Sequence, residues 1–138
     1  MKLFHCLLLI CVTFVSGRIL DECEVAQELL DQGFDRGELP DWVCLVESES
    51  SGDTSVVGGP NTDGSSDYGL FQINDAFWCT PGGAGGECNV ACEDLLDDDI
   101  SDDVQCARKI ESAQGLDAWV GWQNKCSGGR APNVDKCF

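Results

Sequence analysis

Two carboxylates, Glu49 and Asp67, lie eighteen positions apart on segments of different predicted structure. Glu49 ends a helical pattern. Asp67 lies where a polar turn, residues 61–66, meets the apolar and aromatic residues that follow it. Carboxylates held on different elements can have different environments, and therefore different protonation states at one pH. The pair could therefore supply a general acid and a charged partner. The chain has 25 acidic residues, so any chosen Glu and Asp could equally be solvated surface groups.

The first residues have the features of a secretory signal peptide. Lys2 supplies a positive start, an apolar run follows over residues 7–15, and Val15-Ser16-Gly17 is a small-residue cleavage site. A membrane anchor is the alternative, but the run is too short to span a bilayer as a helix. We therefore expect cleavage after Gly17, with residues 18–138 forming a single secreted domain.

Cleavage changes the chemistry that is available. The only histidine, His5, leaves with the signal, so neither a Ser-His-Asp triad nor a His-ligated zinc site can form. The mature chain of 121 residues has 7 basic and 25 acidic residues, a formal charge of −18. Such a charge repels phosphates, which argues against nucleic acid or an anionic membrane as a partner. Carboxylates remain as the obvious acid and base.

Eight cysteines remain after the loss of Cys6 and Cys11. In an exported chain an even number predicts a disulfide framework, here of four bridges. Spacing alone leaves about 105 pairings open.

Helical periodicity and turn residues predict an α+β domain with helices at both ends and a small strand region between them. A first helix is expected from Cys23 to a stop at Gly33, and a second from Pro40 to Glu49. The turn containing Asp63-Gly64 should feed a strand that carries Tyr68, Leu70, Phe71 and Ile73, after a short edge strand at Val56-Val57. A third helix is expected near Asp102, and a fourth capped by Asp117 with Ala118, Trp119 and Trp122 inside it.

The motifs as a set resemble the c-type lysozyme/α-lactalbumin family over the whole mature chain, and insect members most of all. The matching segments are residues 42–44, 49–50, 61–74, 78–79, 88–92, 106–110 and 118–119. The eight cysteines match in order. The resemblance implies a lysozyme-like fold, with a helical lobe, a small antiparallel β lobe and four disulfides. The implied pairs are Cys23–Cys137, Cys44–Cys126, Cys79–Cys92 and Cys88–Cys106.

The same resemblance implies a retaining glycoside hydrolase that cleaves the β-1,4 bond between N-acetylmuramic acid and N-acetylglucosamine. Glu49 would be the general acid and Asp67 the nucleophile or charge stabiliser, with Trp119 as the aromatic wall against Glu49. Lysozymes are themselves the standard example of this two-carboxylate chemistry. A glutamate that ends an apolar helix can be desolvated, which keeps its proton, whereas Asp67 has donors near it in Ser65, Ser66 and Asn74. The substrate-binding residues implied are Gln72, Asn74, Phe77, Trp78, Ala118 and Trp119.

Two positions depart from the family pattern. Phe77 stands where many members have Trp or Tyr, so it keeps stacking on sugar but lacks a polar group. Ser48 replaces a residue that is commonly aromatic just before the catalytic glutamate, which predicts looser packing behind Glu49.

Residues 93–103 contain seven acids and no base. An acidic surface loop that caps a helix is one interpretation. An EF-hand is excluded, because counting Asp97 as its first position places Asp102 where Gly is required and Arg108 where Glu is required. The segment resembles the calcium elbow of α-lactalbumins and calcium-binding lysozymes. That resemblance implies a structural calcium bound by the side chains of Asp97, Asp102 and Asp103 and the carbonyls of Asp94 and Asp99.

We therefore expect a secreted, monomeric muramidase that acts on bacterial peptidoglycan or chitooligosaccharide, with calcium but no organic cofactor. Two alternatives remain open. One is a sugar-binding, lysozyme-like protein with weak or no lytic activity. The other is a non-catalytic modulator of a glycosyltransferase, as α-lactalbumin is, although the presence of both Glu49 and Asp67 argues against it.

Overall fold

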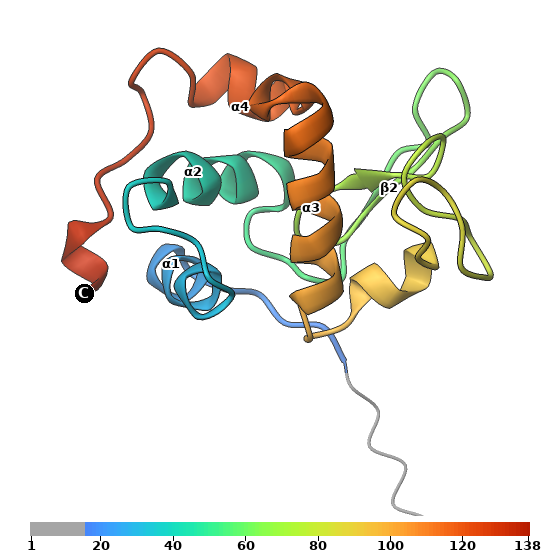
Figure 1. Ribbon diagram of the computed structural model, residues 1–138, viewed down its shortest axis with the longest axis horizontal. Coiled ribbons are helices and arrows are strands. Elements are labelled where there is room, and N and C mark those ends of the chain that lie inside the picture. Colours follow the sequence, from blue (N-terminus) through green and yellow to red (C-terminus); the bar gives the residue numbers. More distant parts are fainter. Residues whose placement is uncertain (1–15) are drawn as a thin grey trace, which may run out of the picture.

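The computed structural model describes residues 16–138; the predicted signal peptide lies largely outside this range. Helices α1 (Glu22–Asp31), α2 (Leu39–Ser50) and α4 (Val120–Lys125) form one side of the molecule, and the sheet and its loops form the other. Helix α3 (Ser101–Gln114) runs between the two sides (Figure 1). This is the predicted α+β arrangement of a helical lobe and a β lobe.

Local sequence signals mark the start of each of the first two helices. Asp21 caps α1 in a capping box, in which its carboxylate accepts from the Glu24 N–H at 2.9 Å and Glu24 accepts from the Asp21 N–H at 2.8 Å. Pro40 lies in the first turn of α2, where its missing N–H costs nothing. Ser51, at φ 53°, ends α2 in the left-handed region directly after the segment that carries Glu49.

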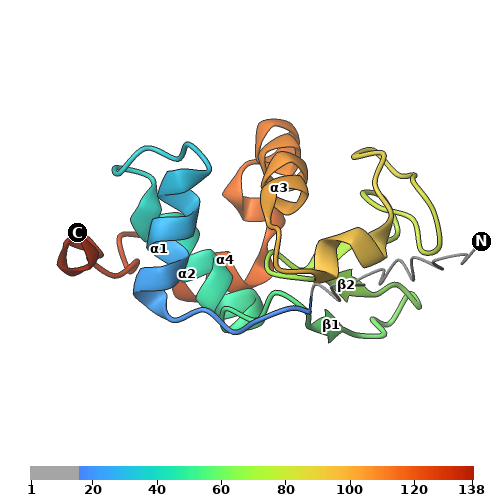
Figure 2. The same ribbon diagram turned by 90° about the horizontal axis from the view of Figure 1, so that it is seen from below.

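The small sheet has three antiparallel strands in the order β1 (Val57–Gly58), β2 (Asp67–Tyr68) and β3 (Ile73–Asn74). Asp67 pairs with Gly58 on one side and with Asn74 on the other. Figure 2 shows β1 and β2 on the far side of α3 from α1 and α2. The register therefore sets Asp67 beside Asn74 in the middle of the sheet.

The prediction of a single strand after the polar turn is wrong. Residues 69–72 form a tight turn that separates β2 from β3. Gly69 at φ 74° and Gln72 at φ 48° both adopt the left-handed region, and the Gln72 N–H donates to the Gly69 carbonyl at 3.1 Å. Leu70 and Phe71 are fully buried in this turn. Their apolar character therefore reflects a core contact and not a continuous strand.

The fourth helix also differs from expectation. A 3-10 turn, η2 (Leu116–Ala118), precedes Trp119, which is extended, and only then does α4 begin. Asp117 makes no capping hydrogen bond. The Trp119 indole N–H instead donates to the Phe71 carbonyl at 2.8 Å, so a contact with the β lobe fixes the residue where the helix was expected to continue.

Trp42 lies at the centre of the core. Its ring makes edge-to-face contacts with Phe34, Phe71 and Trp119, with ring centroids 5.1, 5.8 and 5.6 Å apart. Phe71 comes from the β lobe and the others from the helical lobe, so one aromatic cluster joins the two lobes. The four predicted disulfides are all present: Cys23–Cys137, Cys44–Cys126, Cys79–Cys92 and Cys88–Cys106.

Candidate active site

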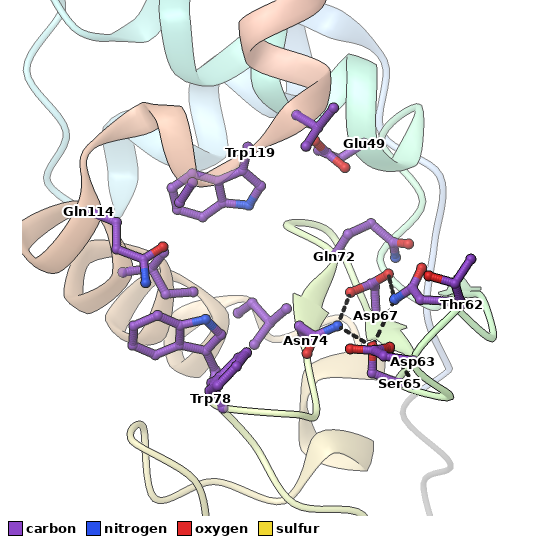
Figure 3. A pocket seen from close by; sticks show the side chains of 16 residues that line it. Glu49, Thr62, Asp63, Ser65, Asp67, Gln72, Asn74, Trp78, Gln114 and Trp119 are labelled. Atoms are coloured by element: carbon purple, nitrogen blue, oxygen red, sulfur yellow. Dashed lines mark hydrogen bonds between the residues drawn. The ribbon is translucent and has the colours of Figure 1, made fainter.

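A cleft of about 570 Å³ lies between the lobes and is lined by both predicted catalytic carboxylates. Figure 3 shows Glu49 and Trp119 on one side of it and Asp67, Gln72 and Asn74 on the other. All six predicted substrate-binding residues line the same cleft: Gln72, Asn74, Phe77, Trp78, Ala118 and Trp119. The structure thus brings all the predicted catalytic and substrate-binding residues together in one cleft.

Glu49 enters the cleft from the end of α2 and is half-buried. Its Oε1 accepts a hydrogen bond of 2.9 Å from the Gly121 N–H. Burial is the main cause that raises the pKa of Glu49 above its ordinary value, and the charge of Asp67 adds to the effect. The Gly121 N–H and Lys125 act in the opposite direction. The net environment favours a carboxyl group that keeps its proton.

Glu49 is held in place by the packing of its neighbours. The Ser50 hydroxyl donates to the Leu70 carbonyl at 2.7 Å, which ties the end of α2 to the turn between β2 and β3. A Cβ on Gly121 would lie 2.6 Å from Glu49 Oε1, so the backbone approaches the carboxyl closely. Ser48 lies with its hydroxyl 3.5 Å from Cys126 Sγ, beside the disulfide to Cys44.

Asp67 has a different environment on β2. Its Oδ1 accepts from the Asn74 side-chain amide at 2.8 Å, and its Oδ2 accepts from the Asn61 side-chain amide at 2.9 Å. Asn74 was expected as a donor, but Ser65 and Ser66 do not donate to Asp67. The Ser65 hydroxyl donates to Asp63 and the Ser66 N–H donates to Asp75. The two asparagine amides thus fix the orientation of the Asp67 carboxylate.

The aromatic residues of the cleft fall into two classes. Trp119 is 5% exposed and belongs to the core as well as to the cleft wall. Phe77 is 68% exposed, which leaves the face of its ring free for a ligand. Trp78 is partly buried between these extremes, whereas Trp122 packs against the core and donates from its indole to Asp41 at 3.0 Å.

Sequence reasoning missed Asn61, Gly121, Gln114 and Val120 as site residues. Asn61 had a detectable signal, because it begins the polar turn that returns the chain to Asp67. Gly121 acts through its backbone N–H, for which the sequence gives no sign. Gln114 and Val120 line the cleft from the segments on either side of η2, which places them there through tertiary packing.

The acidic elbow, residues 93–103, runs from a 3-10 helix that contacts β2 to the first turn of α3. Asp103 is 1% exposed, and neither of its carboxylate oxygens has a hydrogen-bond partner within the described residues. Burial, with Asp102 beside it, raises the pKa of Asp103 to about 10. Burial and then Asp102 also raise the pKa of Asp97. Residues 16–138 contain no group of three or more His, Cys, Asp or Glu already arranged to hold a metal ion.

The other two predicted ligands occupy the flanks of this segment. Asp94 lies in the 3-10 helix η1 (Cys92–Leu96), and Asp99 precedes α3. The Asp99 carboxylate accepts from the Ser101 hydroxyl and N–H, at 2.6 and 3.0 Å. Oδ1 of its side chain is therefore already engaged, and the predicted role falls to its carbonyl.

Comparisons with known proteins agree with this geometry. A model of the C-type lysozyme/alpha-lactalbumin family matches residues 18–137. The chain is 44% identical to Lysozyme c-1 of Anopheles gambiae over 141 residues, covering all of both chains. It is 51% identical to a lysozyme of Galleria mellonella over 116 residues, covering 83% of this chain and 96% of the relative. A crystal structure of canine milk lysozyme superimposes with a TM-score of 0.74 at 38% identity, covering 86% of this chain and 95% of that one. The chain belongs to the C-type lysozyme/α-lactalbumin family.

Proposed function

We propose that this protein is a muramidase that hydrolyses the β-1,4 bond between N-acetylmuramic acid and N-acetylglucosamine in peptidoglycan. One observation carries the proposal: Glu49 and Asp67 face one cleft in opposite environments. Burial raises the pKa of Glu49, whereas both oxygens of Asp67 accept amide hydrogen bonds. A proton donor and a charged carboxylate on either side of a sugar are the two groups that glycoside hydrolysis requires. Related lysozymes from insects support the same activity.

In the proposed mechanism Glu49 donates its proton to the glycosidic oxygen as the bond to the anomeric carbon breaks. Asp67 stabilises the positive charge that develops at that carbon, or forms a bond to it that the incoming water then displaces. Glu49, now ionised, takes a proton from the water that completes hydrolysis. The Gly121 N–H steadies this ionised form by donating to Oε1. The two asparagine amides keep Asp67 oriented throughout.

The substrate cleft suits a chain of N-acetylated sugars. Phe77 offers an exposed ring for stacking on a sugar face, and Trp78 lies next to it in sequence. The Ala118 carbonyl lies at the cleft and would accept a hydrogen bond from one N-acetyl group. Both amide protons of the Asn74 side chain are engaged within the protein, by Ser65 and Asp67, so this side chain holds Asp67 and does not donate to the sugar.

We further propose that the acidic elbow holds a structural calcium, through the side chains of Asp97, Asp102 and Asp103 and the carbonyls of Asp94 and Asp99. The unpartnered and buried carboxylate of Asp103 supports this, because a buried carboxylate without a partner is costly. Calcium prefers about six to eight oxygen ligands. Since no group of three acids is already assembled in residues 16–138, binding would draw these side chains together. Calcium would supply only charge neutralisation, at a distance from the cleft.

The proposal includes export of the mature chain. The predicted signal peptide supports it, as do the disulfides, which persist in oxidising compartments. Across residues 16–138 no helix has both the length and the apolar character needed to cross a membrane.

Glu49→Gln tests the proposed function. Gln keeps the size of the side chain and an oxygen that accepts from Gly121, but it has no proton to give the leaving oxygen. Clearing of bacterial walls and hydrolysis of chitooligosaccharide should both be lost. The thermal midpoint at pH 7 should not fall, because a buried ionisable group is removed. Wall clearing by a folded Glu49→Gln variant would contradict the mechanism.

A further inference from the structure

Both oxygens of Asp67 belong to a ring of hydrogen bonds that also contains Asn61, Asn74 and the Ser65 hydroxyl. Asn74 and Asn61 each use one amide proton for Asp67, as described above. Each uses its second amide proton for the Ser65 hydroxyl oxygen, at 2.9 Å from Asn74 and 3.0 Å from Asn61. Ser65 Oγ and the Asp67 carboxylate are thus joined by two parallel asparagine bridges, which Figure 3 shows in part.

The Ser65 hydroxyl can complete this arrangement in only one way. A hydroxyl has one proton and two acceptor lone pairs. The two asparagine amides take both lone pairs, so the proton must point elsewhere. It points to Asp63 Oδ1, which is 2.6 Å from Ser65 Oγ and also accepts from the Ser65 N–H at 2.9 Å. An ionised carboxylate can only accept, so Asp63 fixes the direction of the Ser65 hydroxyl proton and leaves both lone pairs of Oγ to the asparagine amides.

We propose that Asp63 is a positioning residue for Asp67 and acts through the Ser65 hydroxyl. By accepting the hydroxyl proton, Asp63 keeps Ser65 Oγ as the double acceptor that aligns Asn61 and Asn74 on the two oxygens of Asp67. The inference rests on the proposed role of Asp67 in glycoside hydrolysis. Asp63 itself needs no contact with the reacting atoms.

Without Asp63 the hydroxyl proton has no fixed acceptor. When it turns toward an asparagine Nδ2, which offers only protons, one bridge must tilt or break. The asparagine on that side then no longer holds its oxygen of Asp67. Ser65 is buried and Asp67 is partly buried, so water replaces the lost bond poorly. Asp67 should keep its place in the fold but lose its fixed orientation.

Two other segments contain the same local motif without this connection. Asp53 Oδ1 accepts from the Ser55 N–H and hydroxyl, both at 2.9 Å, and Asp99 binds Ser101 in the same way. Within the part of the chain that the structure describes, no side-chain amide donates to Ser55 or Ser101. The Asp-x-Ser turn therefore forms without asparagine partners. Asp53→Ala is a matched control that removes the same turn and the same charge.

The test compares kcat and KM of the full mature chain on a neutral, soluble chitooligosaccharide. Asp63→Ala should lower kcat about tenfold with little change in KM, because misorientation of a reacting group costs rate more than binding. Asp63→Asn keeps an acceptor oxygen and should hold kcat within about threefold of the parent. Asp53→Ala should match the parent.

Three outcomes would overturn the inference. Asp63→Ala could retain the activity of Asp53→Ala. Asp63→Asn could be as impaired as Asp63→Ala, which would make the charge the active feature. A rise in KM at unchanged kcat would assign Asp63 to direct sugar contact. Asp67→Asn distinguishes failure of the proposed function from failure of this inference. If Asp67→Asn stays active, the proposed function fails. If Asp67→Asn is inactive but Asp63→Ala is normal, only the positioning role of Asp63 fails. Asp63 is exposed, so its variants should fold.

Discussion

Oε1 of Glu49 accepts from the backbone N–H of Gly121, two residues beyond Trp119. The bond joins the end of α2 to the first turn of α4. It therefore connects the proposed acid to the segment after Trp119, which belongs to the same wall of the cleft. The N–H stabilises the ionised form of Glu49, while burial stabilises the protonated form and is the larger effect. The proposed acid therefore has a raised pKa and also a donor placed for the charge it would acquire.

Activity should fall as pH rises through the raised pKa of Glu49, because the reaction needs its proton. Lys125 lowers that pKa, so Lys125→Gln should move the alkaline limb of the kcat profile to higher pH. A shift of about a few tenths of a pH unit is expected for an exposed charge. Lys136→Gln, near Glu22 and the C-terminus, is the control and should leave the profile in place. A shift of the limb to lower pH in Lys125→Gln would show the wrong sign.

Salt should assist lysis of whole bacteria near neutral pH. The chain has a formal charge of −17 before any cleavage, and bacterial walls are also anionic. Salt from about 0.01 to about 0.1 M shortens the screening length from about 30 to about 10 Å and weakens that repulsion. Wall clearing at pH 7 should rise about twofold over this range, and acidic pH should help for the same reason. A neutral chitooligosaccharide should show much less salt dependence. Steep inhibition by salt at pH 7 would contradict the repulsion argument.

Phe77 should contribute to sugar binding through its exposed ring. Phe77→Ala should raise KM for chitooligosaccharide about five- to tenfold with a smaller effect on kcat, as expected for loss of one aromatic contact. Phe77→Tyr adds a hydroxyl at the cleft and should lower KM below that of the parent. Phe138→Ala is the matched control, since Phe138 is also an exposed ring but lies against Arg36 at the C-terminus. Equal KM values for Phe77→Ala and Phe138→Ala would remove Phe77 from the binding site.

The helices could be predicted where local signals decide them. Pro40 and the apolar spacing of Trp42, Val43 and Val46 located α2, and with it Glu49. The disulfide pairs came from the family resemblance alone, because spacing could not choose among them.

Local signals failed where the two lobes meet. The turn at Gly69 and Gln72 depends on burial of Phe71 against Trp42, and the break at Trp119 depends on its bond to the Phe71 carbonyl. These contacts join residues 29 and 48 positions apart, which no local pattern encodes. The hydrogen bonds that hold Asp67 could be predicted only in part, for a related reason. The sequence showed several possible donors, but the hydrogen-bond directions among Asn61, Ser65 and Asn74 exist only in the folded turn.

Calcium should stabilise the fold without taking part in catalysis. Ions that bind the native state alone stabilise it by mass action, by about 2.7 kcal/mol at a hundredfold excess over the dissociation constant. For a domain of this size, the midpoint of thermal unfolding in millimolar calcium should be about 10 °C above that in chelator. Magnesium should have a smaller effect, because it requires a tighter octahedral shell. The disulfides should keep the calcium-free protein folded near room temperature.

Matched variants distinguish a bound ion from general screening of an acidic segment. Asp102→Ala removes a proposed ligand and should abolish the calcium-dependent shift. Asp98→Asn removes a charge from the same segment, but Asp98 pairs with Arg18 and is not a proposed ligand. It should lower the midpoint slightly in both conditions and leave the shift intact. Both variants should retain hydrolysis of chitooligosaccharide at room temperature, because Glu49 and Asp67 are untouched. A midpoint indifferent to calcium, or a shift lost equally in both variants, would reduce the elbow to an acidic surface loop.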